Sequence, residues 1–246
     1  MVHFQKVAVV TGAARGLGRA ISLRLAEDGI AISAWDLNHE GAEETAEMIK
    51  ASGGQAIACG GDASSAADIA AAVARTRSEL SSISILVNNA ALSPFCKFEE
   101  LTEEAWDSLM AINLKGPFLC CKAIIPDMLE GGWGRIINIA SSSAQTGAAG
   151  MAHYGASKGG ILGFTKCLAM EYAERGLTVN AVPPNLINTE GLHEAPVDID
   201  AFARTTPMKR TGTPRNIAAA VAFLATDDAD YITGHTLGVN GGRYCN

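Results

Sequence analysis

Tyr154, Lys158 and Ser141 are the residues whose types and spacing point most directly to chemistry. If a helix opens near residue 153, Tyr154 and Lys158 lie one turn apart on one face, and both side chains reach one site. An ammonium group beside a phenol favours phenolate, so we expect the pKa of Tyr154 to lie below its ordinary value. Such a phenol exchanges a proton with a substrate oxygen near neutral pH, and Ser141, at the end of an apolar run, hydrogen-bonds the same oxygen. Since this spacing is also common on ordinary helix surfaces, the interpretation depends on the rest of the chain.

A glycine-rich turn at residues 11–18 follows the first apolar run and precedes a helical pattern. Glycines let the backbone approach a pyrophosphate closely, and the amino terminus of a helix directs free N–H groups toward it. Three residues separate Gly12 from Gly16 and one separates Gly16 from Gly18, which differs from the general dinucleotide fingerprint. The position between a first strand and a first helix still favours a dinucleotide site over a purely structural turn.

Asp36 ends the second apolar run. A carboxylate there accepts hydrogen bonds from a ribose diol and repels a 2′-phosphate, which favours NAD over NADP. Arg15 argues for NADP, because a guanidinium in the glycine turn can bind a 2′-phosphate. No second basic residue follows Asp36, so NAD is still favoured. Asp62, after the third apolar run, is expected to meet the amino edge of adenine, with a cap or turn aspartate as the alternative.

Three asparagines occupy positions that demand hydrogen bonds. Asn88 and Asn89 follow the fourth apolar run, and we expect both amides to face the crevice at the carboxyl ends of the strands. Asn113 lies inside an apolar helical pattern, where an asparagine is unfavourable unless its amide is bonded.

The scaffold for these residues is expected to be one α/β domain, residues 1–246. Short β-branched runs alternate with longer helical patterns, which is typical of βαβ units. We predict a Rossmann-type, doubly wound parallel sheet of about seven strands with helices on both faces. The expected strands are 7–11, 31–35, 55–59, 83–87, 135–140, 178–182 and 236–239, and the expected helices are 17–28, 41–51, 66–80, 103–129, 153–175 and 214–226.

Composition limits the classes of partner. The 246 residues are 48% hydrophobic and 18% charged, which is enough for one full core. A net charge of −7 without a basic run argues against nucleic acid and against an anionic membrane surface. The six cysteines lack C-x-x-C spacing and are interpreted as reduced thiols of a cytoplasmic protein, without metal. We see no signal peptide and expect no run long enough to span a bilayer.

Taken together, these motifs resemble the classical short-chain dehydrogenase/reductase family, from residue 6 to residue 242. The motifs that carry the resemblance are the glycine turn, Asp36, Asp62, Asn88-Asn89-Ala90, Asn113, Ser141, Tyr154 with Lys158, and residues 179–184. The resemblance implies that Tyr154 exchanges a proton with the substrate oxygen, which Ser141 polarises. It also implies that Lys158 binds the nicotinamide ribose and lowers the pKa of Tyr154, and that Asn113 holds a water behind Lys158.

The resemblance further implies a cofactor-binding set. Its members are Gly12, Arg15, Gly16, Leu17, Gly18, Asp36, Leu37, Asp62, Ala63, Asn89, Ala90, Tyr154, Lys158, Pro184, Ile187 and Thr189. Ile187 and Thr189 would contact the nicotinamide carboxamide. Ala91 and Asn185 stand where the family has glycine. Because asparagine tolerates positive φ best after glycine, we expect the turn at Asn185 to survive.

Residues 185–213 are expected to form a mobile substrate lid with short helical pieces, since they include Pro196 and Pro207 and few helix signals. The first half of this lid is acidic, which disfavours a polyanionic substrate. Its acidic residues are Glu190, Glu194, Asp198 and Asp200. The residues expected to contact the substrate are Ser141, Tyr154, Leu92, Gln145 and Leu186, with Ser93 and Ala144 beside them.

The sequence therefore predicts an NAD-dependent oxidoreductase, an alcohol dehydrogenase or carbonyl reductase of the short-chain type, acting on a small to medium, largely uncharged secondary alcohol or ketone. It lacks the cysteine and histidine pattern of zinc alcohol dehydrogenases, so no metal is expected. One alternative is an NADPH-dependent 3-oxoacyl thioester reductase, disfavoured because residues 127–132 lack the basic patch of the family's acyl-carrier-protein reductases. Another is a non-catalytic dinucleotide sensor, disfavoured because Ser141, Tyr154, Lys158 and Asn113 are all present. Apolar faces on two helices, as in similar proteins, predict a homotetramer, with a dimer as the alternative.

Overall fold

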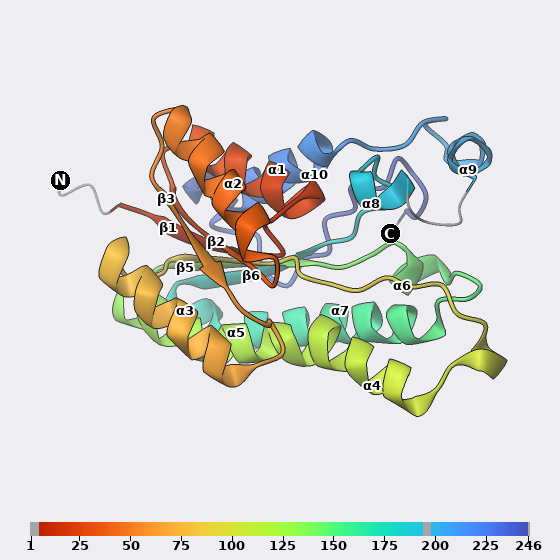
Figure 1. Cartoon of the computed structure of the whole chain (residues 1–246), viewed down its shortest axis with the longest axis horizontal. Coiled ribbons are helices and arrows are strands. Elements are labelled where there is room, and N and C mark those ends of the chain that lie inside the picture. Colours follow the sequence, from red (N-terminus) through yellow and green to blue (C-terminus); the bar gives the residue numbers. More distant parts are fainter. Residues whose placement is uncertain (1–4, 194–197, 246) are drawn as a thin grey trace.

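The computed structural model describes residues 5–193 and 198–245. Within these residues, six parallel strands form one sheet in the order β3-β2-β1-β4-β5-β6 (Figure 1). The strands are β1 (Val7–Thr11), β2 (Ala31–Asp36), β3 (Ala56–Gly60), β4 (Ile85–Asn88), β5 (Gly134–Ile139) and β6 (Leu177–Val182). The strand order reverses between β1 and β4, and such a switch point opens a crevice at the carboxyl ends of the strands. The predicted fold class is confirmed.

Helices cover both faces of this sheet. On one face lie α1 (Gly16–Glu27), α2 (His39–Ala51) and α10 (Pro214–Leu224), and on the other lie α3 (Ala66–Glu79), α5 (Gly116–Glu130) and α7 (Ala152–Tyr172) (Figure 1). Successive strand residues point to opposite faces, so Val10 packs in the cluster with α1 and α10, whereas Val9 packs with α3 and α5. The shorter elements are η1 (Phe98–Glu100), α6 (Ser143–Thr146), η3 (Ala173–Arg175) and η4 (Asp227–Ala229).

The seventh strand expected at 236–239 is not a strand in the structure. Thr236 and Val239 form only isolated parallel bridges, to Ala181 and Pro184. Two successive prolines follow β6, and because they have no N–H a continuous ladder cannot form there. The segment still lies along the outer edge of β6, and it leads the chain to the carboxyl end of the sheet.

The helix expected at 103–129 is present but interrupted. A π-helical turn, η2 (Ala111–Lys115), joins α4 (Glu103–Met110) to α5. Such turns are frequent at functional sites, and this one carries Asn113. By length and composition alone the stretch Glu103–Glu130 is long and apolar enough to cross a membrane, contrary to the sequence expectation. However, 44% of its most apolar window is buried in the fold, so core packing against the sheet accounts for part of these apolar residues.

The lid segment forms two short helices, α8 (Glu190–His193) and α9 (Ile199–Thr205), as predicted. Glu194 and Pro196 of the sequence prediction lie outside the described residues. Figure 1 shows α6, α8 and α9 near one another at the carboxyl end of the sheet, close to the C-terminal end of the chain. The mobility of this lid stays a prediction.

Candidate active site

The glycine turn between β1 and α1 is shaped by contacts that exclude side chains. Gly12 and Gly16 have φ angles of +67° and +57°, in the left-handed region. A Cβ on Gly18 would stand 1.9 Å from the Gly12 carbonyl oxygen, and a Cβ on Gly12 would stand 2.9 Å from the Cα of Ala90. Positions 12 and 18 of the turn therefore have no room for a side chain. This close cradle, at the amino terminus of α1, fits the pyrophosphate of a dinucleotide.

Asn89 and Thr11 hold this turn against β4. The Asn89 side-chain amide donates to the carbonyl oxygens of Thr11 and the following residue at 2.9 and 3.1 Å, and the Thr11 hydroxyl accepts the N–H of Ala90 at 3.0 Å. Asn89 thus positions the cofactor cradle. The expectation that Asn88 also faces the crevice is wrong, because its side chain is buried and donates to Asn138 at 2.8 Å. Neighbouring residues of an extended chain point in opposite directions.

Asp36 lies at the end of β2, in the wall of two cavities. Its carboxylate accepts the backbone N–H groups of Ala14 at 2.9 Å and Asn38 at 2.8 Å. Each carboxylate oxygen keeps a further lone pair with which to accept a ribose hydroxyl. Arg15 and Asp36 both line the larger cavity, so both signs of charge are present in this half of the site. The exposed Leu37 lines the smaller cavity.

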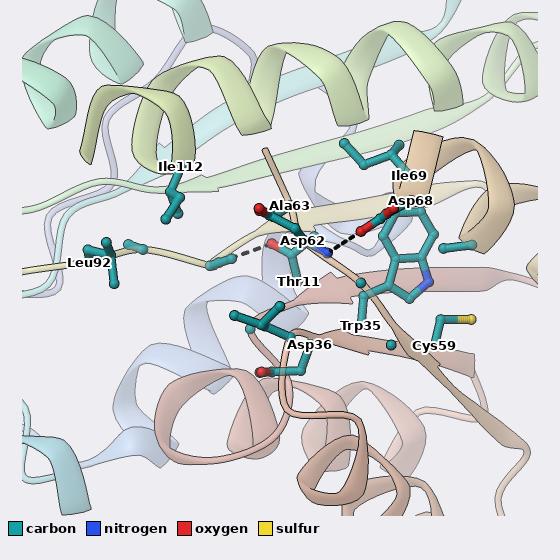
Figure 2. Close-up of a pocket in the computed structure, with 17 residues that line it drawn as sticks. Thr11, Trp35, Asp36, Cys59, Asp62, Ala63, Asp68, Ile69, Leu92 and Ile112 are labelled. Carbon is teal, nitrogen blue, oxygen red and sulfur yellow. Dashed lines mark hydrogen bonds between the residues drawn. The ribbon is translucent and has the colours of Figure 1, made fainter. Parts of the chain in front are cut away.

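The smaller cavity, of about 210 Å³, has Asp62 and Ala63 in its wall (Figure 2). The Asp62 carboxylate accepts the N–H and the hydroxyl of Ser64 at 2.7 and 2.8 Å. The backbone N–H of Asp62 donates to the Asp68 carboxylate at 2.9 Å, a bond marked in Figure 2. Asp62 therefore lines the cavity and also closes its own turn, which confirms the turn role, while its contact with adenine stays a prediction. Trp35 and Asp68 also line this cavity and were not predicted. The sequence gives no signal for Asp68, because an acidic residue in the first turn of a helix is typical of an ordinary helix start.

Ser141 and Tyr154 meet in the larger cleft, of about 860 Å³. Their hydroxyl groups are hydrogen-bonded, and the Ser141 oxygen also lies 2.7 Å from the Ser143 hydroxyl oxygen. Ser141 lies just past the end of β5, and α7 begins beside it, so the carboxyl edge of the sheet brings the three hydroxyls together. No spacing signal distinguishes Ser143 within a run of three serines, and it was not predicted.

Lys158 lies one turn after Tyr154 on α7 and is buried. Its Nζ donates to the carbonyl oxygen of Ile139 at 2.8 Å and lies 5.9 Å from the centre of the Tyr154 ring. Burial lowers the pKa of Lys158 to about 8, since the charged form loses its hydration. The amine is therefore able to exchange a proton near neutral pH, and it lines the same cleft as Tyr154.

The expected fall in the pKa of Tyr154 is wrong for this structure. Burial raises the pKa of the Tyr154 phenol, and its hydrogen bond with Ser141 opposes that rise without reversing it. Burial also disfavours the charged form of Lys158, whose Nζ is directed at a backbone carbonyl, so the lysine gives the phenolate little support. Tyr154 is accordingly protonated at neutral pH, which is the form that donates a proton to a carbonyl oxygen.

Asn113 is fully buried and its amide is fully engaged, as the sequence required. Its Oδ1 accepts the N–H of Leu92 at 2.8 Å, and its Nδ2 donates to the Leu92 carbonyl at 2.8 Å and to the Ser157 hydroxyl at 3.2 Å. The Ser157 hydroxyl in turn donates to the Tyr154 carbonyl at 2.8 Å. Asn113 therefore ties the loop at Leu92 to α7. The water implied behind Lys158 stays a prediction.

A family model described as enoyl-(acyl carrier protein) reductase matches residues 12–243. The chain belongs to the short-chain dehydrogenase/reductase family. It is an oxidoreductase of that family, whose members use nicotinamide cofactors.

This short-chain dehydrogenase/reductase is similar to nodulation protein G of Azospirillum brasilense, with 42% identity over 240 residues, 97% of this chain and 98% of that protein. It is also similar to the 3-oxoacyl-[acyl-carrier-protein] reductase FabG of Staphylococcus epidermidis, with 39% identity over 244 residues, 97% of this chain and 99% of that protein. The FabG of Pseudomonas aeruginosa is 39% identical over 240 residues, 97% of each chain. The likeness therefore extends over nearly the whole chain.

The two departures from the family pattern have different surroundings. Ala91 lines both cavities. Asn185 does not adopt positive φ, since Lys209 is the non-glycine residue that does so among the described residues. The Asn185 side chain instead accepts from the Ser142 hydroxyl at 3.3 Å and donates to the Thr206 hydroxyl at 3.2 Å. The expectation of a glycine-like turn is thus wrong, because the side chain is held between the catalytic loop and the lid.

The remaining predicted residues divide between the cleft wall and other positions. Those in the wall are Gly12, Gly16, Leu17, Gly18, Ala90, Leu92, Ser93, Pro184, Leu186, Ile187 and Thr189. Gln145 and Ala144 lie on α6 and do not line the cleft, since this one-turn helix presents Ser143 and Thr146 instead. The unpredicted residues in the wall include Phe95, Met151, Phe202 and Arg243, which come from segments whose meeting no local pattern encodes.

Proposed function

We propose that this short-chain dehydrogenase/reductase interconverts a secondary alcohol and a ketone with NAD, on a small to medium substrate whose body is largely uncharged. The observation that carries the proposal is the hydrogen-bonded pair of Tyr154 and Ser141, which opens onto the same cleft as the glycine turn and Asp36. This arrangement holds a proton donor and a dinucleotide cradle in one cavity. Alcohol–ketone chemistry needs that combination.

In ketone reduction, the nicotinamide supplies the hydride and the protein handles the proton. Tyr154, kept protonated by its raised pKa, donates to the carbonyl oxygen while Ser141 donates a second hydrogen bond to that oxygen. Lys158, with a pKa lowered to about 8, lines the same cleft as Tyr154. In the oxidation direction the steps run in reverse, and the ionised form of Tyr154 accepts the proton, so a raised pKa favours oxidation at higher pH.

Asp36 supports NAD rather than NADP. Its carboxylate is held by two backbone N–H groups at the end of β2, facing the position of the adenosine ribose. A fixed negative charge there favours a diol and repels a phosphate. Arg15 opposes this preference, and cofactor kinetics decide between them.

A second candidate is an NADPH-dependent 3-oxoacyl thioester reductase, which the names of the FabG relatives favour. The segment at 127–132 argues against docking of an acidic carrier. It reads Asp-Met-Leu-Glu-Gly-Gly, and the Asp127 carboxylate is bonded to Arg77 and to the N–H of Ile83. A non-catalytic dinucleotide sensor is disfavoured, because Ser141, Tyr154 and Lys158 line one cleft.

The test is a turnover assay that follows nicotinamide absorbance, with neutral secondary alcohols and the matching ketones, each with NAD(H) and NADP(H). We expect turnover of neutral alcohols with NAD. The variant Tyr154→Phe should lower kcat by roughly 100- to 10,000-fold, because it removes the acid–base group. Unchanged turnover in that variant would refute the mechanism, and activity only with NADPH on acyl thioesters would favour the second candidate. Tight cofactor binding without any turnover would favour the sensor.

We also propose a homotetramer, with a dimer as the alternative. Phe118 on α5 and Met170 on α7 are 45% and 85% exposed, and such apolar side chains on two long helices suit burial between copies of the chain. Light scattering coupled to gel filtration measures the assembly, and a monomer would contradict the proposal. A cytoplasmic location stays a prediction.

A further inference from the structure

Arg243 lies in the wall of the cleft that holds Tyr154 and Ser141. It follows the segment that runs along the outer edge of β6. Strand β6 forms one lateral edge of the sheet, and β2 and β3 lie at the opposite lateral edge. Asp36 and the small cavity with Asp62 lie at that opposite edge. Arg243 is therefore on the substrate side of the catalytic residues, away from the adenosine side.

The Arg243 guanidinium is supported but has no acidic partner in the described part of the chain. Its central carbon lies 5.5 Å from the centre of the Phe202 ring on α9, within the range of a cation–π contact. This contact holds the guanidinium beside the aromatic ring. The planar fork of a guanidinium matches the two oxygens of a carboxylate.

The substrate side of the cleft combines apolar side chains with neutral polar ones such as Ser93, Thr146 and Asn185. Among the described residues that line the cleft, Asp36 is the one acidic side chain, and it lies at the adenosine end. The apolar residues of the substrate side are Leu92, Phe95, Met151, Leu186, Leu192 and Phe202. A substrate pocket with one guanidinium and walls of apolar and neutral polar side chains suits a largely uncharged molecule that carries one negative charge.

We propose that Arg243 binds a carboxylate of the substrate, so that the substrate is a hydroxy acid or oxo acid with an otherwise uncharged body. This inference rests on the proposed alcohol–ketone function and names its substrate class. A monoanion suits the site better than a dianionic phosphate, because one guanidinium must balance the charge. The helix that carries Phe202 also begins with the exposed carboxylates of Asp198 and Asp200, which disfavour further negative charge.

The experiment compares 3-hydroxyhexanoate and 5-hydroxyhexanoate with their methyl esters, using the full-length wild type, Arg243→Met and Arg243→Lys with NAD and with NADP. We expect wild-type kcat/KM to be roughly 10- to 100-fold higher for at least one acid than for its ester, as for a charge-assisted bidentate contact. In Arg243→Met, kcat/KM for the acid should fall to that for the ester, while kcat/KM for the ester should not change. Arg243→Lys should keep part of the preference for the acid. Arg204→Met, which removes an exposed cation of α9 outside the cleft wall, should keep the wild-type ratio of acid to ester.

Equal use of acid and ester by the wild type, or an equal loss of both in Arg243→Met, would overturn the carboxylate site while the alcohol–ketone function stands. Turnover of 3-hydroxyhexanoyl-CoA alone, with loss in Arg243→Met, would assign the arginine to a carrier phosphate and also overturn the proposal. If no alcohol is oxidised with either cofactor, the proposed function fails. Calorimetric titration with hexanoate then decides the inference, since weaker binding to Arg243→Met supports the site and equal or absent binding in both proteins overturns it.

Discussion

The two halves of the cleft are built by different means. In the cofactor half, backbone meets backbone, and neither Gly12 nor Gly18 has room for a Cβ. In the substrate half, side chains from distant segments meet, as Asn185 does with Ser142 and Thr206. Because there is no space for a larger side chain, the cofactor half does not tolerate substitution of these glycines. In the substrate half, exchanging side chains changes the shape and polarity of the pocket.

The largest effect is expected from Gly18→Ala in the cofactor half. The added Cβ would stand 1.9 Å from the Gly12 carbonyl oxygen, so the cradle must open. Overpacking of this kind should weaken NAD binding by roughly 100-fold. The matched control is Gly191→Ala in the lid, where the nearest atom to the new Cβ is 3.9 Å away. Calorimetry with NAD measures both variants, and equal affinities would break the distinction between the halves.

Lys158 lies where the halves meet, and its buried amine should make stability depend on pH. Its pKa is about 8 in the folded protein against an ordinary value of 10.5, so between these values the unfolded chain binds more protons. The free energy of unfolding therefore rises as the pH increases from about 8 to about 10.5, and the penalty is complete below pH 8. The full difference corresponds to on the order of 3 kcal/mol.

Urea denaturation of the wild type and Lys158→Met across this pH range isolates the lysine from other titrating groups. The variant should gain most over the wild type below pH 8, and this advantage should shrink toward pH 10.5. A constant difference between the two proteins would show that burial does not lower the pKa of Lys158.

Asp36 tests whether the cofactor half also sets the choice of cofactor. Asp36→Ser removes the charge that meets the ribose, and kcat/KM with NAD should fall by roughly 10- to 100-fold, as for a lost charge-assisted hydrogen bond. Activity with NADP should rise relative to NAD, because the carboxylate that repels a 2′-phosphate is removed. Asp36→Glu, which keeps the charge, serves as the control. An unchanged NAD-to-NADP ratio in Asp36→Ser would mean that Arg15 dominates.

The smallest effect is expected from Asn185→Gly in the substrate half, which restores the residue usual in the family. It removes two neutral hydrogen bonds, at 3.3 and 3.2 Å, between the catalytic loop and the lid. The KM for the alcohol should rise by roughly 2- to 10-fold, with little change in the KM for NAD. Asn185→Asp, whose carboxylate accepts from both hydroxyls, should behave like the wild type. A larger change in the KM for NAD than in that for the alcohol would contradict the division.

The amino-acid sequence by itself determined the local features of this protein. The six strands, the long helices and the position of the glycine turn follow from periodicity and from residues that are neighbours in the chain. The spacing of Tyr154 and Lys158 on one helix face likewise needs only the geometry of an α-helix. From these patterns alone, the catalytic residues and the dinucleotide turn could be predicted to lie at the same edge of the sheet.

The tertiary structure decided what depends on burial and on distant contacts. Burial, rather than the neighbouring lysine, set the direction of the Tyr154 pKa. The prolines that follow β6 prevent a continuous ladder, so the expected seventh strand does not form. The side chain of Asn185 hydrogen-bonds two hydroxyls that are distant from it in the chain. The meeting of Arg243 with Phe202 had no sequence signal at all. A local pattern encodes which face of an element is apolar, but desolvation and partner choice depend on which segments the whole fold packs together.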